Sequence, residues 1–203
     1  MAFTAKDVQT LRERTGVGMM DCKKALSEAD GDMEKAVELL REKGLSAAAK
    51  KATRIAAEGL VYAYVDDAKK VGVVVEVNSE TDFVAKNADF QEFVKTVAEI
   101  VAATNPADVA ALLETPFAGV GTVADALRDK ILVIGENLSI RRFVRYEGDV
   151  VAYVHGGGRI GVLVKFDADA ATAGSTALLD AGKDVAMQIA ALNPLYLGRD
   201  AVP

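Results

Sequence analysis

The sequence has little of the side-chain chemistry that many enzymes and secreted proteins depend on. Its 203 residues include one cysteine and one histidine. A single thiol, Cys22, excludes an internal disulfide framework and a cysteine-based zinc site. His155 would have to be the base of any serine-histidine-aspartate triad. Cys22 and His155 could in principle form a nucleophile–base pair, but neither local sequence supports one, so we expect a non-enzyme with Cys22 buried on a helix and His155 in a turn.

Long apolar runs and an excess of positive charge are also missing. No run reaches the roughly 18 residues that cross a bilayer, and the N-terminus lacks a signal-peptide pattern. The net charge of −6 disfavours a dedicated nucleic-acid binder, which needs a basic surface. The glycines at 156–161 suit a hairpin turn and do not match a phosphate-binding motif. We therefore expect a cytoplasmic protein with no cofactor, no metal, no membrane partner and no direct DNA contact.

The N-terminal quarter of the chain is predicted to be helical. Thr4 with Asp7 three residues later predicts a capping box at the start of a first helix, and paired glycines after it predict a turn. Gly44 is expected to end a third helix. We predict a three-helix bundle over residues 1–45, followed by a helical connector over residues 46–58.

The rest of the chain is an imperfect repeat, with matched segments at 59–65 and 148–154, 70–75 and 159–164, and 97–106 and 185–194. Each copy has the pattern strand, turn, strand, then a helix that ends at Asn-Pro, where proline cannot continue it. Two such units predict an α+β fold of antiparallel hairpins with helices on one side. The expected units are 59–137 and 138–203, with a helix over 122–135 and a strand over 138–146 that leads into the second copy.

The two copies differ after their second strands. The first copy has an aromatic residue and a lysine within residues 78–87, and the second has neither at the equivalent place. A function confined to one copy is therefore expected in the first. Ser79 and Asp82 can cap a short helical turn there, and periodicity alone favours Phe83 as a core residue.

A pair of methionines at the start of the second helix is also unusual. Adjacent helical positions point about 100° apart, so Met19 and Met20 cannot both face the centre of a core. We expect one of them at an apolar edge, where a flexible side chain suits adaptable contacts.

Four segments in order carry a family resemblance: residues 11–26, residues 76–87, residues 134–137 with Arg141 and Arg142, and His155 with residues 159–164. They resemble the motifs of the translation elongation factor Ts family, over essentially the whole chain. The resemblance implies a ubiquitin-associated-like three-helix bundle and a two-subdomain core of the dimerisation-core type. It also implies exchange of GDP for GTP on elongation factor Tu, and a homodimer or a heterotetramer with that partner.

The resemblance assigns roles to individual residues. Thr81, Asp82, Phe83 and Val84 would enter the GTPase and displace the contacts of the nucleotide's magnesium. Partner-binding roles are implied for Arg12, Met19, Met20, Lys23, Lys51, Ile134, Gly135 and His155. Family members commonly continue past the segment that matches residues 193–200 into a coiled-coil hairpin and a C-terminal module, so contacts made there are expected to be missing.

Two other classes of function stay open on the residues alone. A helical-bundle adaptor would use the N-terminal bundle and would not need Asp82 or Phe83. A thiol enzyme would depend on Cys22.

Overall fold

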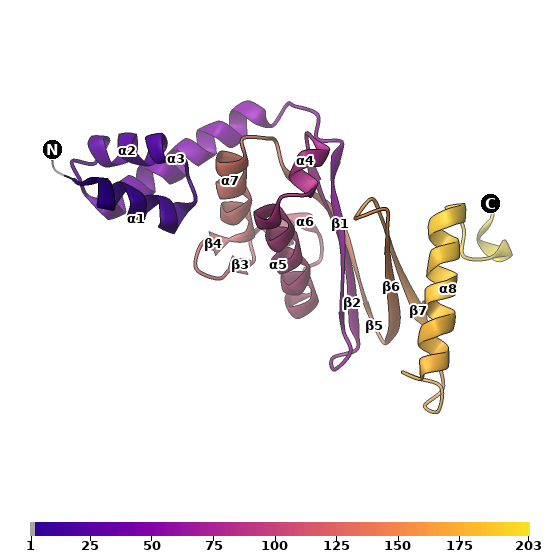
Figure 1. The fold of residues 1–203 in the computed structure, drawn as a ribbon. Coiled ribbons are helices and arrows are strands. Elements are labelled where there is room, and N and C mark those ends of the chain that lie inside the picture. Colours follow the sequence, from indigo (N-terminus) through magenta and orange to yellow (C-terminus); the bar gives the residue numbers. More distant parts are fainter. Residues whose placement is uncertain (1–2) are drawn as a thin grey trace.

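The computed structural model describes residues 3–203 and confirms an α+β architecture. Figure 1 shows an elongated molecule in which an N-terminal helical bundle, a group of helices, two sheet layers and a last helix follow one another. Among the described residues there is no helix with the length and apolar content that a membrane crossing requires.

The bundle consists of α1 (Ala5–Thr15), α2 (Met19–Glu28) and α3 (Met33–Lys51). The predicted capping box forms: the Asp7 carboxylate accepts from the backbone N–H of Thr4 at 2.7 Å, and the Thr4 hydroxyl accepts from that of Asp7 at 3.3 Å. The bundle has a small core of its own, which includes Leu11, Cys22 and Leu26. These local signals were sufficient because capping involves residues only three apart.

The predicted end of the third helix at Gly44 is wrong. Helix α3 continues through Gly44 to Lys51, so only the first part of the expected connector over residues 46–58 is helical. Gly44 is buried against α7 (Val123–Ile134), and a Cβ placed on it would lie 3.8 Å from the backbone oxygen of Arg128. Contact with α7 stabilises the helix there, and this tertiary contact outweighs the weak helix propensity of one glycine.

The central sheet contains three antiparallel strands in the order β1-β2-β5: β1 is Glu58–Asp66, β2 is Val71–Ser79 and β5 is Ser139–Glu147. The predicted strand over 138–146 exists, but the structure assigns it to the sheet of the first copy and not to the second unit. It pairs with β2, for example Val144 with Val74. Gly148, at φ 118°, then lets the chain turn sharply into the second hairpin.

The second hairpin is β6 (Asp149–His155) with β7 (Ile160–Phe166), and the helices of the two copies are α5 (Ala88–Thr104) and α8 (Thr176–Leu192). Both helices end at an asparagine in the left-handed conformation, Asn105 at φ 48° and Asn193 at φ 46°. The smaller elements are α4 (Asp82–Ala85), α6 (Val109–Leu113), β3 (Pro116–Phe117), β4 (Gly121–Thr122) and a 3-10 helix at Arg199–Ala201.

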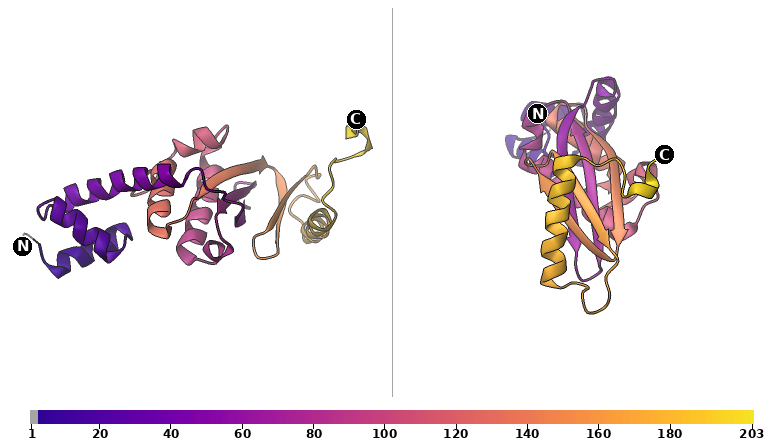
Figure 2. Two further views of the ribbon diagram at one scale, coloured as in Figure 1. Left: turned by 90° about the horizontal axis from the view of Figure 1, so that it is seen from above. Right: turned by 90° about the vertical axis from the view of Figure 1, so that its right-hand side faces the viewer.

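The two copies face each other through their sheets. Helix α5 covers the outer face of the central sheet and α8 covers the outer face of the hairpin, as the two views of Figure 2 also indicate. The repeat-equivalent glycines lie between the layers: a Cβ on Gly72 would lie 2.8 Å from Val150, and one on Gly161 would lie 2.3 Å from Val61. The glycines therefore permit close packing of the two sheets.

Candidate functional site

The turn that follows β2 is held by hydrogen bonds from outside the turn. Thr81 occupies the N-cap position of α4, but its side chain makes no capping bond to the helix. Its hydroxyl donates to one carboxylate oxygen of Glu136 at 2.6 Å, and its backbone N–H donates to the other at 3.0 Å. The Ser79 hydroxyl donates to the Thr81 carbonyl at 2.9 Å. Ser79 therefore supports the turn without capping it, contrary to the sequence prediction.

Phe83 points into solvent, so its prediction as a core residue is wrong. Its side chain is 77% exposed, whereas its neighbour Val84 is 6% exposed and belongs to the core under the central sheet. A one-turn helix can direct only part of its surface inward, and Val84 takes that position. The Lys86 ammonium lies 5.7 Å from the centre of the Phe83 ring and 3.1 Å from the Asp82 carboxylate.

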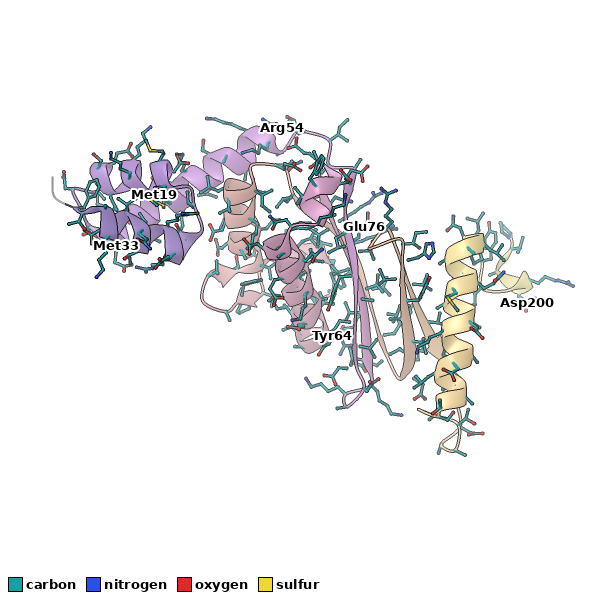
Figure 3. The ribbon with its side chains drawn as sticks, viewed as in Figure 1. Met19, Met33, Arg54, Tyr64, Glu76 and Asp200 are labelled. Carbon is teal, nitrogen blue, oxygen red and sulfur yellow. The ribbon has the colours of Figure 1, made fainter. Side chains whose placement is uncertain are left out.

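A second set of contacts joins this turn to the linker after α3. The Glu80 carboxylate accepts from the backbone N–H of Asn137 at 2.6 Å and forms an ion pair with Arg54 at 3.5 Å. The side-chain amide of Asn137 donates to the Arg54 carbonyl at 2.8 Å. Arg54 is labelled in Figure 3 above the short helix α4. Three segments that are far apart in sequence therefore meet around the turn.

Both methionines at the start of α2 are exposed, Met19 by 42% and Met20 by 74%. One of them is predicted to lie at an apolar edge, and neither is buried. The α1–α2 turn that precedes them lies near α7, since a Cβ placed on Gly16 would lie 3.7 Å from the Val133 side chain. The methionine end of the bundle is therefore close to the end of α7.

The remaining predicted contact residues are at least partly accessible. Arg12, Lys23 and His155 are exposed, Gly135 is exposed, and Lys51 and Ile134 are partly buried. Gly135 ends α7 in the left-handed conformation at φ 85°. We refer to α2, the end of α7, α4 and the β6–β7 turn together as the contact edge, because they lie along one side of the molecule in Figure 1.

Backbone contacts support this placement of the contact edge. Glu58, at the start of β1, pairs with Ser79, from which the chain enters the Thr81 turn. A few residues along β1, the Val61 N–H donates to the Gly158 carbonyl in the β6–β7 turn at 2.7 Å. The turn with Phe83 and the turn after His155 are therefore at the same end of the two facing sheets.

Comparison with known proteins identifies the family. A family model described as Elongation factor TS matches residues 80–203. Over 203 residues the chain is 56% identical to elongation factor Ts of Clostridioides difficile (strain 630), which covers 98% of this chain and 66% of the relative. The chain belongs to the elongation factor Ts family. It is also 57% identical over 198 residues to elongation factor Ts of Clostridium perfringens (strain SM101), covering 96% of this chain and 64% of the relative.

A relative from another genus gives the same result for this family member. The chain is 54% identical over 206 residues to elongation factor Ts of Syntrophotalea carbinolica, with 100% of this chain and 67% of the relative covered. The chain thus spans about two thirds of the length of the curated relatives that it matches, and just under that for the first of them.

The structure does not bring Cys22 and His155 together. Cys22 is buried in the bundle core, where burial raises the pKa of its thiol, and its Sγ contacts Thr15 and the Val17 carbonyl. His155 ends β6, in the other half of the chain, and its Nδ1 lies 2.8 Å from the Tyr153 hydroxyl. Within residues 3–203 no group of three His, Cys, Asp or Glu side chains could hold a metal ion.

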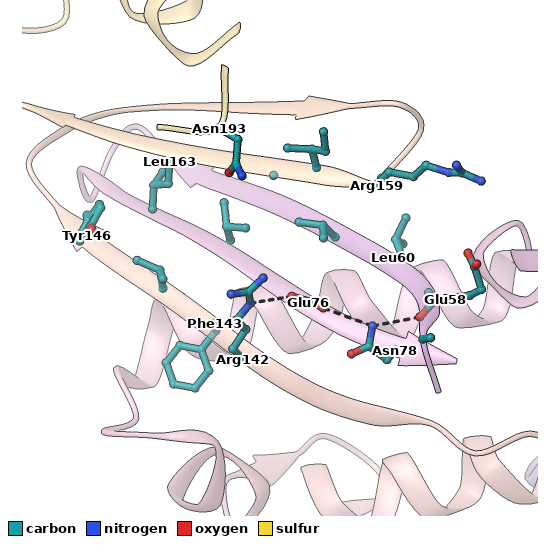
Figure 4. Close-up of a pocket in the computed structure, with 18 residues that line it drawn as sticks. Glu58, Leu60, Glu76, Asn78, Arg142, Phe143, Tyr146, Arg159, Leu163 and Asn193 are labelled. Atoms are coloured by element: carbon teal, nitrogen blue, oxygen red, sulfur yellow. Dashed lines mark hydrogen bonds and ion pairs between the residues drawn. The ribbon is translucent and has the colours of Figure 1, made fainter. Parts of the chain in front are cut away.

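A groove of about 600 Å³ lies between the central sheet and β7 (Figure 4). Two of its charged side chains are paired with each other: Arg142 Nε lies 2.6 Å from the Glu76 carboxylate. The Asn78 side-chain amide donates to the Glu58 carbonyl at 3.0 Å and to Glu76 at 3.3 Å. These contacts form a structural network across β1, β2 and β5.

The residues that hold the Thr81 turn are not predictable from the sequence pattern. Glu136 and Asn137 stand out only as part of a family motif, and nothing in the local sequence marks Glu80 or Arg54. The one local signal is the carboxylate of Glu136 directly after Gly135, the glycine that ends α7. Its partner, Thr81, is 55 residues away in the chain, so the sequence does not show what the carboxylate binds.

Proposed function

We propose that this chain is a nucleotide exchange factor that binds the GDP form of elongation factor Tu and accelerates GDP release. Membership of the elongation factor Ts family supports the proposal. The observation that carries it is the exposed Phe83, which stands beside Asp82 on a turn that Glu136 holds at its start and buried Val84 anchors to the core. Such a site is suited to inserting side chains into a partner. The proposed action involves no covalent step.

The proposed action begins with the insertion of Asp82 and Phe83 near the magnesium that holds GDP in the partner. Full burial of a Phe side chain contributes about 1.5–3 kcal/mol, which corresponds to roughly tenfold to a hundredfold in affinity. The exposed ion pair of Asp82 with Lys86 is of a kind that contributes little. Asp82 can therefore exchange Lys86 for polar groups around the partner's magnesium at small cost.

Thermodynamic linkage converts this binding into release of GDP. Magnesium bridges the nucleotide phosphates to a GTPase, so a state with displaced magnesium contacts holds GDP weakly. If the chain binds that state more tightly, it weakens GDP binding by the same factor by which GDP weakens its own binding. Binding of GTP then favours dissociation of the chain, which makes the action catalytic without a substrate of its own.

We also propose the wider contact surface that the family resemblance implies. The bundle would dock on the GTPase through Arg12, Met19, Met20 and Lys23, and further contacts would come from Lys51, Ile134, Gly135 and His155. Most of these residues belong to, or adjoin, the contact edge. The proposed units are the bundle over residues 1–45, the connector over 46–58, which begins inside α3, and the core units over 59–137 and 138–203, with β5 of the second range completing the sheet of the first.

The setting of this function is proposed on the same grounds. We propose action in the cytoplasm during translation elongation, with elongation factor Tu as partner in its GDP-bound and nucleotide-free forms. A homodimer, or a heterotetramer with the partner, is the proposed assembly. No membrane or DNA partner is part of the proposal.

The test is stopped-flow release of a fluorescent GDP analogue from elongation factor Tu at fixed magnesium. We expect the release rate to rise with chain concentration, to saturate, and to collapse in the Asp82→Ala/Phe83→Ala variant. Leu197→Ala is a matched control, because Leu197 is a fully exposed apolar residue in the C-terminal segment. If the double variant accelerates release as well as the wild type, exchange does not depend on Asp82 and Phe83. If the wild type binds the partner without accelerating release, the adaptor function is favoured and the proposal is refuted.

A further inference from the structure

We propose that Glu136 is a positioning residue that holds Asp82 and Phe83 in the orientation needed for exchange. This inference rests on the proposed function and assigns a role to a residue outside the predicted contact set. Its basis is the two-point contact between the Glu136 carboxylate and Thr81, at 2.6 Å to the hydroxyl and 3.0 Å to the backbone N–H.

The contact controls the first residue of the turn. Thr81 is the N-cap of α4, and its N–H donates to Glu136 outside the turn. With both hydrogen bonds made to one carboxylate, the backbone and the side-chain rotamer of Thr81 are fixed together. Hydrogen bonds to a charged group are stronger than neutral ones, and this pair is partly buried. The direction in which Asp82 and Phe83 leave the sheet is therefore set by Glu136.

A reciprocal contact makes the arrangement rigid. While Glu136 accepts from Thr81, Glu80 accepts from the backbone N–H of Asn137 at 2.6 Å. The segment Glu80–Thr81 and the segment Glu136–Asn137 thus each provide one carboxylate and one backbone N–H to the other. The end of α7, with Ile134 and Gly135, becomes one unit with the Phe83 turn. A partner that binds the end of α7 would then have Phe83 already in a fixed position relative to it.

Loss of Glu136 should affect the exchange step more than binding. The other contact residues remain in Glu136→Ala, so the chain still docks, but Phe83 is no longer held in one orientation. Glu136→Gln is the conservative comparison. Its amide oxygen can accept from the Thr81 N–H, and its NH₂ can donate to the Thr81 hydroxyl, because a hydroxyl both donates and accepts.

The experiment compares wild type, Glu136→Ala, Glu136→Gln and the control Glu114→Ala, which alters an exposed carboxylate at the end of α6. One measurement is the GDP-release titration, which separates the saturating rate from the half-saturating concentration. The other is hydrogen exchange of the Thr81 amide in the free chain, which does not depend on the partner.

For Glu136→Ala we expect a fall of about tenfold or more in the saturating rate, as for the loss of charge-assisted hydrogen bonds. The half-saturating concentration should change by less than about threefold, a small change on the affinity scale. Exchange of the Thr81 amide should become roughly tenfold faster, in line with loss of its hydrogen-bond acceptor. Glu136→Gln should restore most of both properties, and Glu114→Ala should match the wild type.

Three results would overturn the inference in distinguishable ways. An unchanged saturating rate with a deprotected Thr81 amide would show that the orientation is not needed. Failure of Glu136→Gln to differ from Glu136→Ala would show that the two hydrogen bonds are not what matters. A wild type that does not accelerate GDP release would refute the proposed function itself. If Glu136→Ala does not fold, Thr81→Val removes the hydroxyl contact at nearly constant shape and must lower the saturating rate.

Discussion

Replacement of Gly161 by alanine should destabilise the protein by adding one methyl group between the two sheets. The new Cβ would lie 2.3 Å from Val61 Cγ1 and 2.9 Å from Val74 Cγ1. Both distances are too short for carbon–carbon contact, whose optimum is about 3.5–4.0 Å. Gly161 is not among the residues with positive φ, so the expected effect comes from crowding and not from backbone strain.

The size of the effect follows from how little the neighbours can move. The two valines are on adjacent strands of the central sheet, and the Val61 N–H is hydrogen-bonded across the layers to Gly158 at 2.7 Å. Overpacking of this kind costs about 1–3 kcal/mol, and the lower entropy of the unfolded alanine chain offsets about 0.4–1 kcal/mol. From the midpoints of these ranges we expect a net loss of about 1 kcal/mol in the free energy of unfolding, with a fall of roughly 2–4 °C in Tm.

The matched control is the same chemical change at Gly44. There a Cβ would meet its neighbours at 3.8 Å, an ordinary contact distance, and alanine is the better helix former by about 0.8–1.0 kcal/mol. Gly44→Ala should therefore raise the midpoint of urea unfolding, followed by far-ultraviolet circular dichroism, whereas Gly161→Ala lowers it. Equal or greater stability of Gly161→Ala would refute the close packing of the two sheets.

Four other outcomes follow from the structure. Leu26→Ala should cost the bundle about 2–5 kcal/mol, seen as faster hydrogen exchange in α1–α3 with the sheets unaffected. Thr122→Ala removes the capping box of α7 and should cost about 1 kcal/mol in urea unfolding. Burial raises the pKa of Asp129 above its usual 3.8, so stability should fall as pH rises from that value through the raised pKa. Asp129→Asn should remove this fall. The variant should be more stable than the wild type above the raised pKa and equally stable below pH 3.8. Phe83→Ala should leave the Tm within about 1 °C, because surface substitutions change stability little, and a larger drop would contradict its exposure.

Features decided by neighbouring residues could be predicted from the sequence. The capping box at Thr4 and the repeated hairpins with their Asn-Pro helix ends depend on residues a few positions apart, and the structure has them as predicted. The burial of Cys22 was also predicted correctly. These are cases in which local geometry leaves one favourable solution.

Features decided by distant contacts were not predictable in the same way. Gly44 stays helical because α7 lies against it, and β5 joins the first sheet because the edge of β2 is available to it. Phe83 has an apolar side chain, but Val84 takes the inward position on the same turn. The role of Glu136 depends on a threonine 55 residues away. In each case the deciding partner is absent from the local sequence.

Because α3 is one uninterrupted helix, a rotation at its contact with α7 is carried along the helix to the bundle. The helix packs on α7 near Gly44 and carries the bundle at its other end, 11 residues away. At 1.5 Å per residue this arm is about 16 Å long, so a tilt of about 10° at the α7 contact displaces the bundle by about 3 Å. A small rotation at the pivot is thereby amplified at the α2–α3 turn, whereas the start of α2 with its methionines, which is close to α7, and the turn with Phe83 move little.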